Sequence, residues 1–195
     1  MRIFAAIVPP EEVTAHLDDF LDVRREAAAF RWTRAEQGHL TLAFAAEAPE
    51  RALDEISERL DRAAARHSPF VLRIGGGGAF PNPARAKVLY ADVVPADPDD
   101  LAMPAALDEL GHLARSARSA LAKAGAAVDG QRFRPHLTLA RLGHPEEVSN
   151  WVRLLDAYEG PAWTVDEIEL VASHLGEGPR RTPRYESLET FSLSG

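Results

Sequence analysis

The sequence predicts a mixed fold of helices and strands that is divided into two similar lobes. One observation is that the apolar spacing switches repeatedly between period two, typical of strands, and period three to four, typical of helices. The other is a repeated word: HLTLA occurs at residues 39–43 and again at residues 136–140 of the 195-residue chain. The copies lie about half a chain apart, which indicates a duplicated unit, and two copies are too few for a solenoid.

The first half of the chain begins with a predicted strand at residues 2–8, a short apolar run closed by two prolines. From Glu11 the period becomes that of a helix, which we expect to reach about residue 28, with acidic residues near its positive N-terminal end. Residues 39–45 return to period two and predict a strand. Residues 49–67 then predict a second helix.

Two further strands are predicted at residues 70–76 and 87–94, on either side of a loop rich in glycine and proline. The four glycines at 75–78 do not match a phosphate-binding loop, because no Lys-Ser or Lys-Thr follows them and no helix opens there. We therefore interpret these glycines as a bend at the end of a strand.

The second half of the chain is predicted to repeat the order of the first half. Its expected elements are a helix at 104–124 that Gly125 ends, a strand at 132–142, a helix at 145–158, and strands at 163–175 and 184–194. Both copies of HLTLA therefore lie on strands, each preceded by a helix and followed by a helix and two strands.

The composition is that of an ordinary globular protein, with 46% hydrophobic and 27% charged residues. The absence of cysteine excludes disulfides, a thiol nucleophile and cysteine-bound metals. No apolar run approaches the roughly 18–20 residues that cross a bilayer, so we expect an untargeted protein with no membrane partner. A chain without disulfides suits the reducing cytoplasm, and the lack of a long apolar seam favours a monomer. The net charge of −8 argues against a broad nucleic-acid surface, but a small phosphorylated ligand or one RNA end can bind where arginines cluster.

Each HLTLA word presents chemistry on one face of its strand. Side chains alternate across a strand, so the histidine and threonine point one way, roughly 6–7 Å apart, and the leucines point the other way. If the two lobes face each other, His39, Thr41, His136 and Thr138 surround one ligand. Histidine accepts or donates a proton near neutral pH, and a threonine hydroxyl can hold a phosphate oxygen. This quartet predicts phosphoryl chemistry without a metal.

Two alternatives to catalysis stay open for the repeated histidines. They could share a structural use in both lobes. They could also bind zinc, although a catalytic zinc usually takes three protein ligands and no H-E-x-x-H word adjoins either copy. We expect no metal and no cofactor. The remaining histidines are interpreted as surface or structural residues: His16, His67, His112, His144 and His174.

At these residues the sequence resembles a known family. The paired H-x-T-x words are similar to those of the two-histidine (2H) phosphoesterase superfamily. They are most similar to the bacterial and archaeal RNA 2′,3′-cyclic phosphodiesterases, also called 2′-5′ RNA ligases or LigT-like proteins. The resemblance extends over nearly the whole chain and includes MRIFAAIVPP, RWTRAEQGHLTLAF, GGGGAFPNPARAKVLYADV, RFRPHLTLARL and IELVASHL. Each word alone is weakly specific, whereas the pair within these flanks is specific.

The resemblance implies an α+β fold, two-lobed and pseudo-twofold, in which antiparallel sheets line a central cleft and helices lie outside. Residues 1–195 would form one such domain. It also implies metal-independent opening of a 2′,3′-cyclic phosphate to a 2′-phosphate, and some family members join RNA ends through a 2′-5′ linkage. The implied partners are RNA or nucleotide ends that carry the cyclic phosphate.

The family's functional positions can be carried over onto this chain. His39 resembles the proton donor to the departing 3′ oxygen and His136 the base that activates water, an assignment that comes from the resemblance alone. Thr41 and Thr138 would hold the phosphate oxygens. Arg141 follows the second word, as basic residues do in relatives, and would clamp the phosphate. Strict alternation puts Arg141 on the leucine face, so it reaches the cleft only if the strand twists or bulges.

Other residues and functions keep two interpretations. Phe4 and Phe44 either pack in the core, which is the commoner use, or stack on a base. A group of arginines forms either a basic rim for RNA or a solvated surface: Arg132, Arg134, Arg180, Arg181 and Arg184. Rival functions are a 2H enzyme for ADP-ribose cyclic phosphate or 2′-5′ oligonucleotides, and a non-catalytic protein that binds RNA ends.

Overall fold

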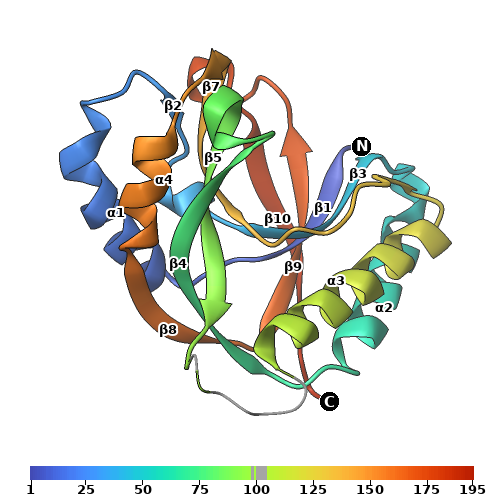
Figure 1. Ribbon diagram of the computed structural model, residues 1–195. Helices are drawn as coiled ribbons and strands as arrows, with labels where there is room; N and C mark the ends of the chain where they lie inside the picture. Colours follow the sequence, from blue (N-terminus) through green and yellow to red (C-terminus); the bar gives the residue numbers. More distant parts are fainter. Residues whose placement is uncertain (98, 100–104) are drawn as a thin grey trace.

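The computed structural model describes residues 1–97, 99 and 105–195 (Figure 1). The α-helices are α1 (Glu11–Arg25), α2 (Leu53–Ala64), α3 (Ala106–Lys123) and α4 (Ser149–Asp156). The strands are β1 (Ile3–Ile7), β2 (Arg31–Trp32), β3 (Leu40–Glu47), β4 (Phe70–Phe80), β5 (Ala86–Pro95), β6 (Ala127–Val128), β7 (Leu137–Glu146), β8 (Glu159–Val165), β9 (Glu167–His174) and β10 (Arg184–Ser192). Short 3₁₀ turns occupy Ala35–Gln37, Glu50–Ala52, Pro83–Arg85 and Pro179–Arg181.

The strands form one sheet in the order β10-β9-β1-β3-β7-β5-β4-β8, and every neighbouring pair is antiparallel. The order is symmetric about the junction of β3 and β7, the two strands that carry the repeated word. Leu40 pairs with Leu137 at this junction. The short strands are exchanged across it, because β2 pairs with β7 and β6 pairs with β3. The sheet is therefore pseudo-twofold, with the two words at its axis.

The helices cover the outer face of each half of the sheet and bury its apolar side chains. Helices α2 and α3 pack on each other and on the half that contains β3, β9 and β10, whereas α1 and α4 pack on β8 and β4 (Figure 1). Each half is thus covered by one helix from each half of the chain. Leu40 and Leu137 point to this helical side and are buried. Among the described helices, none combines the length and the apolarity that a bilayer span needs.

The predicted order of major elements is correct, but several boundaries are wrong. The single strand predicted at 163–175 is two strands, β8 and β9, which are separated at Asp166. The strand predicted from residue 132 begins only at Leu137, and it runs to Glu146, so the helix after it begins at Ser149 rather than at 145. The strands β2 and β6 were not predicted. Residue 104, the predicted start of the third helix, lies outside the described residues.

The glycine run is the largest local error of the sequence analysis. Strand β4 continues through residues 75–78 to Phe80 rather than ending in a bend. A register shift against β5 lies between Ile74 and Gly77, and Gly76 in the shifted segment has φ +79°. Glycine tolerates this left-handed conformation, so the run forms a β-bulge within a continuous strand.

Candidate active site

The two repeated words meet where β3 and β7 pair. His39 and His136 directly precede these strands, and the Leu40–Leu137 pair lies between them. Because the pairing is antiparallel, the same register places His39 beside Thr138 and Thr41 beside His136. All four side chains are half-buried, on the face of the sheet opposite the buried leucines. The structure thus brings the predicted quartet together from the two halves of the chain.

Both imidazoles are oriented by the same hydrogen bond. The Nδ1 atom of His39 lies 2.9 Å from the carbonyl oxygen of Gln37, and Nδ1 of His136 lies 2.7 Å from that of Arg134. A carbonyl oxygen only accepts, so Nδ1 must carry the proton in each ring. The free nitrogen is then Nε2 in both cases. Each Nε2 can accept a proton when its ring is neutral and donate one when the ring is protonated.

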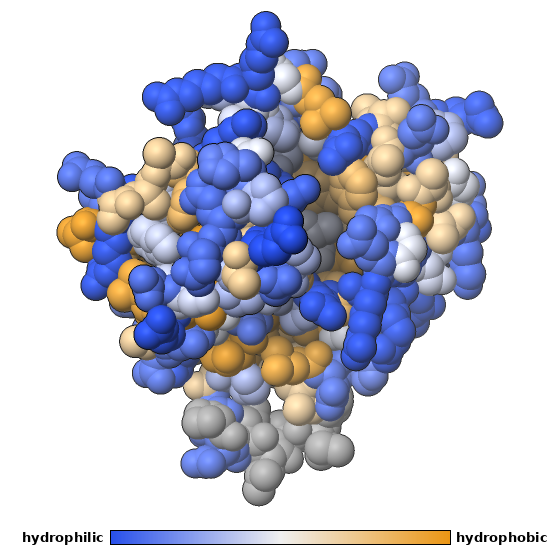
Figure 2. Space-filling view, turned by 45° about the horizontal axis from the view of Figure 1, so that its top comes forward, coloured by the Kyte–Doolittle hydropathy of each residue, from blue (hydrophilic) through white to orange (hydrophobic). Residues whose placement is uncertain are grey.

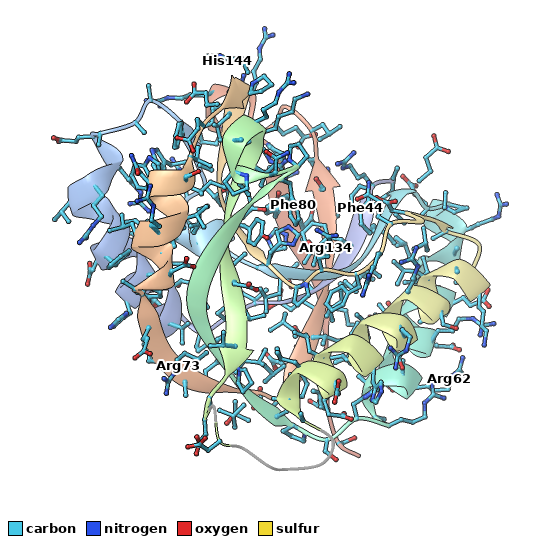
Figure 3. The ribbon with its side chains drawn as sticks, in the orientation of Figure 1. Phe44, Arg62, Arg73, Phe80, Arg134 and His144 are labelled. Carbon is cyan, nitrogen blue, oxygen red and sulfur yellow. The ribbon has the colours of Figure 1, made fainter. Side chains whose placement is uncertain are left out.

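Each histidine lies against two aromatic rings, which differ between the halves. His39 stacks on Phe4, with ring centroids 4.7 Å apart, and meets the edge of Tyr185 at 5.3 Å. His136 meets Phe80 edge-on at 4.9 Å and lies 5.3 Å from Tyr90. Figure 3 shows the labelled Phe80, Phe44 and Arg134 toward the middle of the molecule. These rings exclude water from the imidazoles.

Burial and nearby charge lower the pKa of both histidines. Desolvation is the main cause of the lowered pKa of His39, and the positive charges of His136 and Arg141 add to it. Desolvation also lowers the pKa of His136, where Arg141 adds to the effect and the carboxylate of Asp92 opposes it. The charge of Arg141 acts on both rings, as expected for two groups at one site.

A β-bulge brings Arg141 to this site. Both central strands carry an extra residue directly after the threonine, Leu42 after Thr41 in β3 and Leu139 after Thr138 in β7. One extra residue reverses the alternation of side chains beyond it. Arg141 therefore lines the cleft instead of lying on the leucine face. This is the condition that the sequence analysis set for Arg141 to reach the ligand.

A cleft of about 730 Å³ opens beside His39, and Figure 2 shows the hollow between the lobes. Besides His39 and Thr41 it is lined by aromatic and polar side chains and by five arginines: Arg2, Arg31, Arg141, Arg180 and Arg181. Among the described residues, no carboxylate lines it. His136 and Thr138 do not line this volume themselves and lie beyond it, across the β3–β7 junction.

Several arginines of the cleft lie where their charge or their backbone conformation is unfavourable. Arg31 of β2 lies directly opposite Arg141 of β7, and like charges in facing positions destabilise a sheet. Arg180 and Arg181 have positive φ values of 54° and 61°, which non-glycine residues seldom adopt. The guanidinium of Arg2 lies 4.4 Å from the centre of the Phe44 ring. Such an arrangement fits a site that binds an anion.

The predicted basic rim is only partly found at the cleft. Arg180 and Arg181 line it, whereas Arg184 is paired with Glu177 at 2.8 Å and with Glu186 at 3.6 Å. Arg132 and Arg134 are exposed on the segment before His136 and do not line the cleft. Arg2 and Arg31 were missed, because strand pairing rather than any local pattern brings them to the site.

Only some of the aromatic residues at the cleft were predicted from the sequence. Phe4 and Phe44 both line the cleft, but Phe4 is buried and stacks on His39, whereas Phe44 is only half-buried. Trp32, Phe30 and Tyr185 also line the cleft and were not singled out from the sequence. Trp32 and Arg31 belong to the RWTR word that was quoted for the resemblance, which was the available signal.

The other histidines have partners away from this site. Each bonds or pairs with at least one neighbour: His16 with Tyr158, His67 with Ser116 and Glu109, His112 with Glu109, His144 with Glu146, and His174 with Glu177 and Glu186. Within residues 1–97, 99 and 105–195, no three His, Cys, Asp or Glu side chains form a group that could hold a metal ion.

Comparison with known proteins identifies the family. A model of the 2′-5′ RNA ligase superfamily matches residues 9–177. An RNA 2′,3′-cyclic phosphodiesterase of Thermus thermophilus is 32% identical over 199 aligned residues, which cover 100% of this chain and 91% of the relative. Two solved structures are also similar.

The first structure is TT0787 of Thermus thermophilus, with a TM-score of 0.78 and 30% identity over 100% of this chain and 99% of that one. The second is E. coli LigT complexed with 3′-AMP, with a TM-score of 0.75 and 25% identity over 100% and 98% of the chains. These matches confirm the predicted LigT-like α+β fold of antiparallel strands with helices outside, and they confirm the resemblance drawn from the paired words. The chain belongs to the 2′-5′ RNA ligase superfamily.

Proposed function

We propose that this chain hydrolyses 2′,3′-cyclic phosphates at RNA or nucleotide ends to 2′-phosphates, with His39 and His136 as the acid–base pair. The observation that carries the proposal is the matched pair of Nδ1-to-carbonyl hydrogen bonds, which leaves the Nε2 atom of His39 available beside an arginine-lined cleft and that of His136 available across the β3–β7 junction. The relatives named RNA 2′,3′-cyclic phosphodiesterases support the choice of substrate.

The reaction follows from two proton transfers. Neutral His136 takes a proton from a water molecule through Nε2, and the water oxygen attacks the phosphorus atom. As the bond from phosphorus to the 3′ oxygen breaks, protonated His39 gives the proton on its Nε2 to that oxygen. The products are a 2′-phosphate and a free 3′ hydroxyl, with the two histidines in exchanged protonation states. General acid–base groups of this kind contribute roughly 10²–10⁴-fold.

The remaining groups of the site hold the phosphate. Thr41 and Thr138 donate hydrogen bonds to the non-bridging oxygens, where negative charge must be stabilised in the transition state. The guanidinium of Arg141 neutralises this charge and can bind two oxygens at once. Aromatic rings in the cleft, among them Phe44 and Trp32, offer faces on which the terminal base can stack.

The lowered pKa of both histidines predicts an acidic optimum. Activity requires one protonated and one neutral imidazole, and burial lowers the pKa of both below the ordinary 6.5. The bell-shaped profile of kcat/KM, which reports the free enzyme, is therefore expected to centre below pH 6.5. An anionic substrate raises both pKa values when it binds, so the kcat profile is expected to lie at higher pH.

The decisive experiment offers the chain a panel of substrates and identifies the position of the product phosphate. The panel contains cyclic mononucleotides, an RNA oligomer with a cyclic end, ADP-ribose cyclic phosphate and 2′-5′-linked oligonucleotides. We expect turnover of the first two to 2′-phosphates, and loss of this turnover in His39→Ala and His136→Ala. Turnover confined to another substrate would select a rival 2H activity, and tight binding without turnover would select the RNA-end binder.

Reverse ligation is a second proposed activity. The same acid and base serve if a 5′ hydroxyl of RNA replaces water: His136 takes the proton of that hydroxyl, its oxygen attacks the phosphorus atom, and the 3′ oxygen leaves with the proton of His39, which joins the ends through a 2′-5′ linkage. Incubating the cyclic-ended oligomer with a 5′-hydroxyl acceptor tests it. A cytoplasmic location, a monomeric state and a single domain over residues 1–195 also stay predictions, which cell fractionation, light scattering and unfolding in one transition would check.

A further inference from the structure

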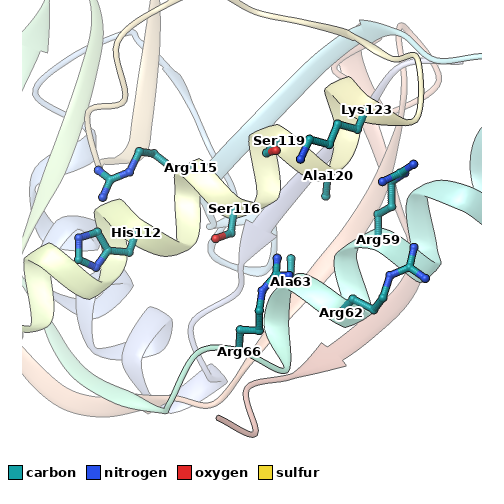
Figure 4. Close-up of a pocket in the computed structure, with 10 residues that line it drawn as sticks. All are labelled: Arg59, Arg62, Ala63, Arg66, His112, Arg115, Ser116, Ser119, Ala120 and Lys123. Atoms are coloured by element: carbon teal, nitrogen blue, oxygen red, sulfur yellow. The ribbon is translucent and has the colours of Figure 1, made fainter.

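A second cationic site lies outside the cleft, in a groove of about 400 Å³ between α2 and α3 (Figure 4). Both helices contribute to it in rows spaced three or four residues apart. The residues from α2 and the turn that follows it are Arg59, Arg62, Ala63 and Arg66, and those on α3 are His112, Arg115, Ser116, Ser119, Ala120 and Lys123. We call these ten residues the α2–α3 groove.

Part of the positive charge in the α2–α3 groove has no acidic partner. Arg59 and Arg62 have partners on their own helix, at 2.7 Å and 3.8 Å. In the part of the chain that the structure describes, Arg66, Arg115 and Lys123 form no salt bridge. Like charges at this helical spacing destabilise a helix, and the protein as a whole carries a net charge of −8. Cations that gather here despite their mutual repulsion, in a chain that is acidic overall, fit the binding of a polyanion.

The chemistry of the groove fits phosphates rather than bases. Its walls are exposed guanidinium and ammonium groups with two serine hydroxyls, and its floor contains the buried small side chains Ala63 and Ala120. Among the lining residues that the structure describes there is no Phe, Tyr or Trp, and the only ring is that of His112, so the groove offers many more contacts to phosphates than stacking faces for bases. The helical rise of about 1.5 Å per residue spreads Arg115 and Lys123, on α3, over about 12 Å, which suits several phosphates in a row.

The end of the groove leads toward the active cleft. Lys123 is the last residue of α3, and β6 follows it and pairs with β3 through Val128 and Ala45, next to Phe44 of the cleft. The connecting segment is held on α3 by Arg118, which donates hydrogen bonds to the backbone carbonyl groups of Asp129 and Gln131. The chain therefore runs from the C-terminal end of α3, at one end of the groove, to β6 and so to β3, the strand that contributes Thr41 and Phe44 to the cleft.

From these observations we propose that the α2–α3 groove binds consecutive backbone phosphates of a single-stranded RNA whose end occupies the cleft. This inference rests on the proposed function for the identity of the strand. The groove contributes affinity for the body of the RNA without reading its sequence, and it leaves the chemistry at the terminal phosphate unchanged. A cyclic mononucleotide is too short to reach it.

The test compares Arg115→Glu with Arg153→Glu, a matched charge reversal on an exposed arginine of α4 in the other lobe. Binding of a fluorescent 12-nucleotide RNA with a 3′-terminal phosphate is measured by anisotropy across salt concentrations, and hydrolysis of a cyclic mononucleotide is measured in parallel. A further variant, Arg66→Glu with Arg115→Glu, is expected to weaken RNA binding about tenfold at low salt. It should also reduce the slope of log affinity against log salt by about 1.4, or about 0.7 for each lost phosphate contact.

Arg115→Glu and the double variant should leave kcat/KM for the mononucleotide within about twofold of the wild type. Arg153→Glu should change neither RNA binding nor mononucleotide hydrolysis. Equal RNA affinity in the wild type and the double variant overturns the proposal, and so does an equal loss in Arg153→Glu. Stronger binding to phosphatidylglycerol vesicles than to RNA would also overturn it, in favour of a membrane surface. Absence of mononucleotide hydrolysis in the wild type contradicts the proposed function instead, and the binding comparison still decides the groove.

The thermal midpoint of unfolding shows whether the variants are folded, and a milder double variant serves as a second control. Because the substitutions relieve repulsion among cations, we expect the midpoint to stay constant or to rise. If the glutamate variants unfold, Arg66→Gln with Arg115→Gln replaces them. Loss of RNA affinity in the glutamine variant at an unchanged midpoint supports the proposal, and retained affinity contradicts it.

Discussion

The two histidines of the cleft share one backbone arrangement but lie in different surroundings. Both directly precede a central strand, both donate from Nδ1 to the carbonyl group two residues earlier, and both strands bulge directly after the threonine. The environments then diverge. His39 is packed between Phe4 and Tyr185, whereas His136 has Phe80 and Tyr90 beside it and the carboxylate of Asp92 acting on its pKa.

This difference teaches that the shared backbone arrangement sets the geometry of the two imidazoles, while the side chains around them set the electrostatics. An acid and a base need the same reach toward one phosphorus atom but opposite protonation states. The matching position after the bulge shows the same division, because it is Phe44 in β3 and Arg141 in β7. One half therefore presents an aromatic face and the other a positive charge, and the pseudo-twofold site becomes chemically asymmetric.

The largest expected effect is the loss of activity when either histidine is replaced, and the pH dependence of the remaining activity distinguishes the two histidines. His39→Ala and His136→Ala should each lower kcat/KM by roughly 10²–10⁴-fold. If His136 is the base, His39→Ala leaves an activity that only rises with pH, because the surviving imidazole must be neutral. His136→Ala should leave an activity that only falls with pH. Kinetics between pH 4 and 8 provide the measurement, and exchanged slopes would exchange the two roles.

The next effect concerns the matching positions after the bulges. Arg141→Gln should lower kcat/KM about 10- to 100-fold, because a charged donor to the phosphate is lost. It should also raise the pKa of both histidines, since the charge of Arg141 lowers both. Phe44→Leu carries no change of charge and should leave the pH profile where it is. A pH optimum that does not move in Arg141→Gln would show that this side chain lies too far from the imidazoles.

Gly78 lies against Tyr90 on the His136 side of the site, and replacing it tests the packing of that side alone. A Cβ atom added at Gly78 would lie 2.3 Å from the hydroxyl oxygen and 2.4 Å from the ring of Tyr90, whereas one at Gly130 would meet nothing within 4 Å. Gly78→Ala should therefore destabilise the fold by about 1–3 kcal/mol and shift the NMR signals of His136 but not those of His39. Gly130→Ala is the control and should stay within about 0.5 kcal/mol of the wild type. Equal stabilities of the two variants would contradict the tight Tyr90 contact.

A smaller effect isolates the charge of Asp92. This carboxylate raises the pKa of His136, whereas the pKa of His39 is set by burial, its backbone hydrogen bond and positive charges. Asp92→Asn should therefore lower the pKa of His136 and leave that of His39 unchanged. NMR titration of the two imidazoles measures both values in one experiment. A parallel shift of the two pKa values would mean that the difference between the halves does not come from Asp92.

The smallest effect is on stability at acidic pH. Both histidines have a lower pKa in the folded chain than the ordinary 6.5, so the unfolded chain binds more protons once the pH falls below about 6.5. The free energy of unfolding should therefore be independent of these groups above that pH and should decrease as the pH drops toward the folded pKa values. Denaturant titrations should give a shallower decrease for His39→Gln. An unchanged pH dependence in that variant would remove burial of His39 as the cause.

Local periodicity was sufficient for much of the fold and for the central site. Helices α1, α2 and α3 and strands β1, β3 and β5 were predicted because each follows one period over its length. The boundary near Asp166 was missed, since a single aspartate without a glycine or proline beside it leaves β8 and β9 looking like one extended run. The glycines of β4 read as a break, because the strand partners that hold them extended lie elsewhere in the chain.

The sequence alone determined the two HLTLA words and therefore which histidines and threonines share a face, because that depends only on alternation along a strand. The tertiary structure decided that the words pair at Leu40 and Leu137, that a bulge turns Arg141 into the cleft, and that arginines from separate segments of the chain line it. It also decided that cations gather in the α2–α3 groove of an acidic chain. The physical reason is that strand register and helix packing join residues far apart in sequence, and a shift of one residue reverses which side chains meet.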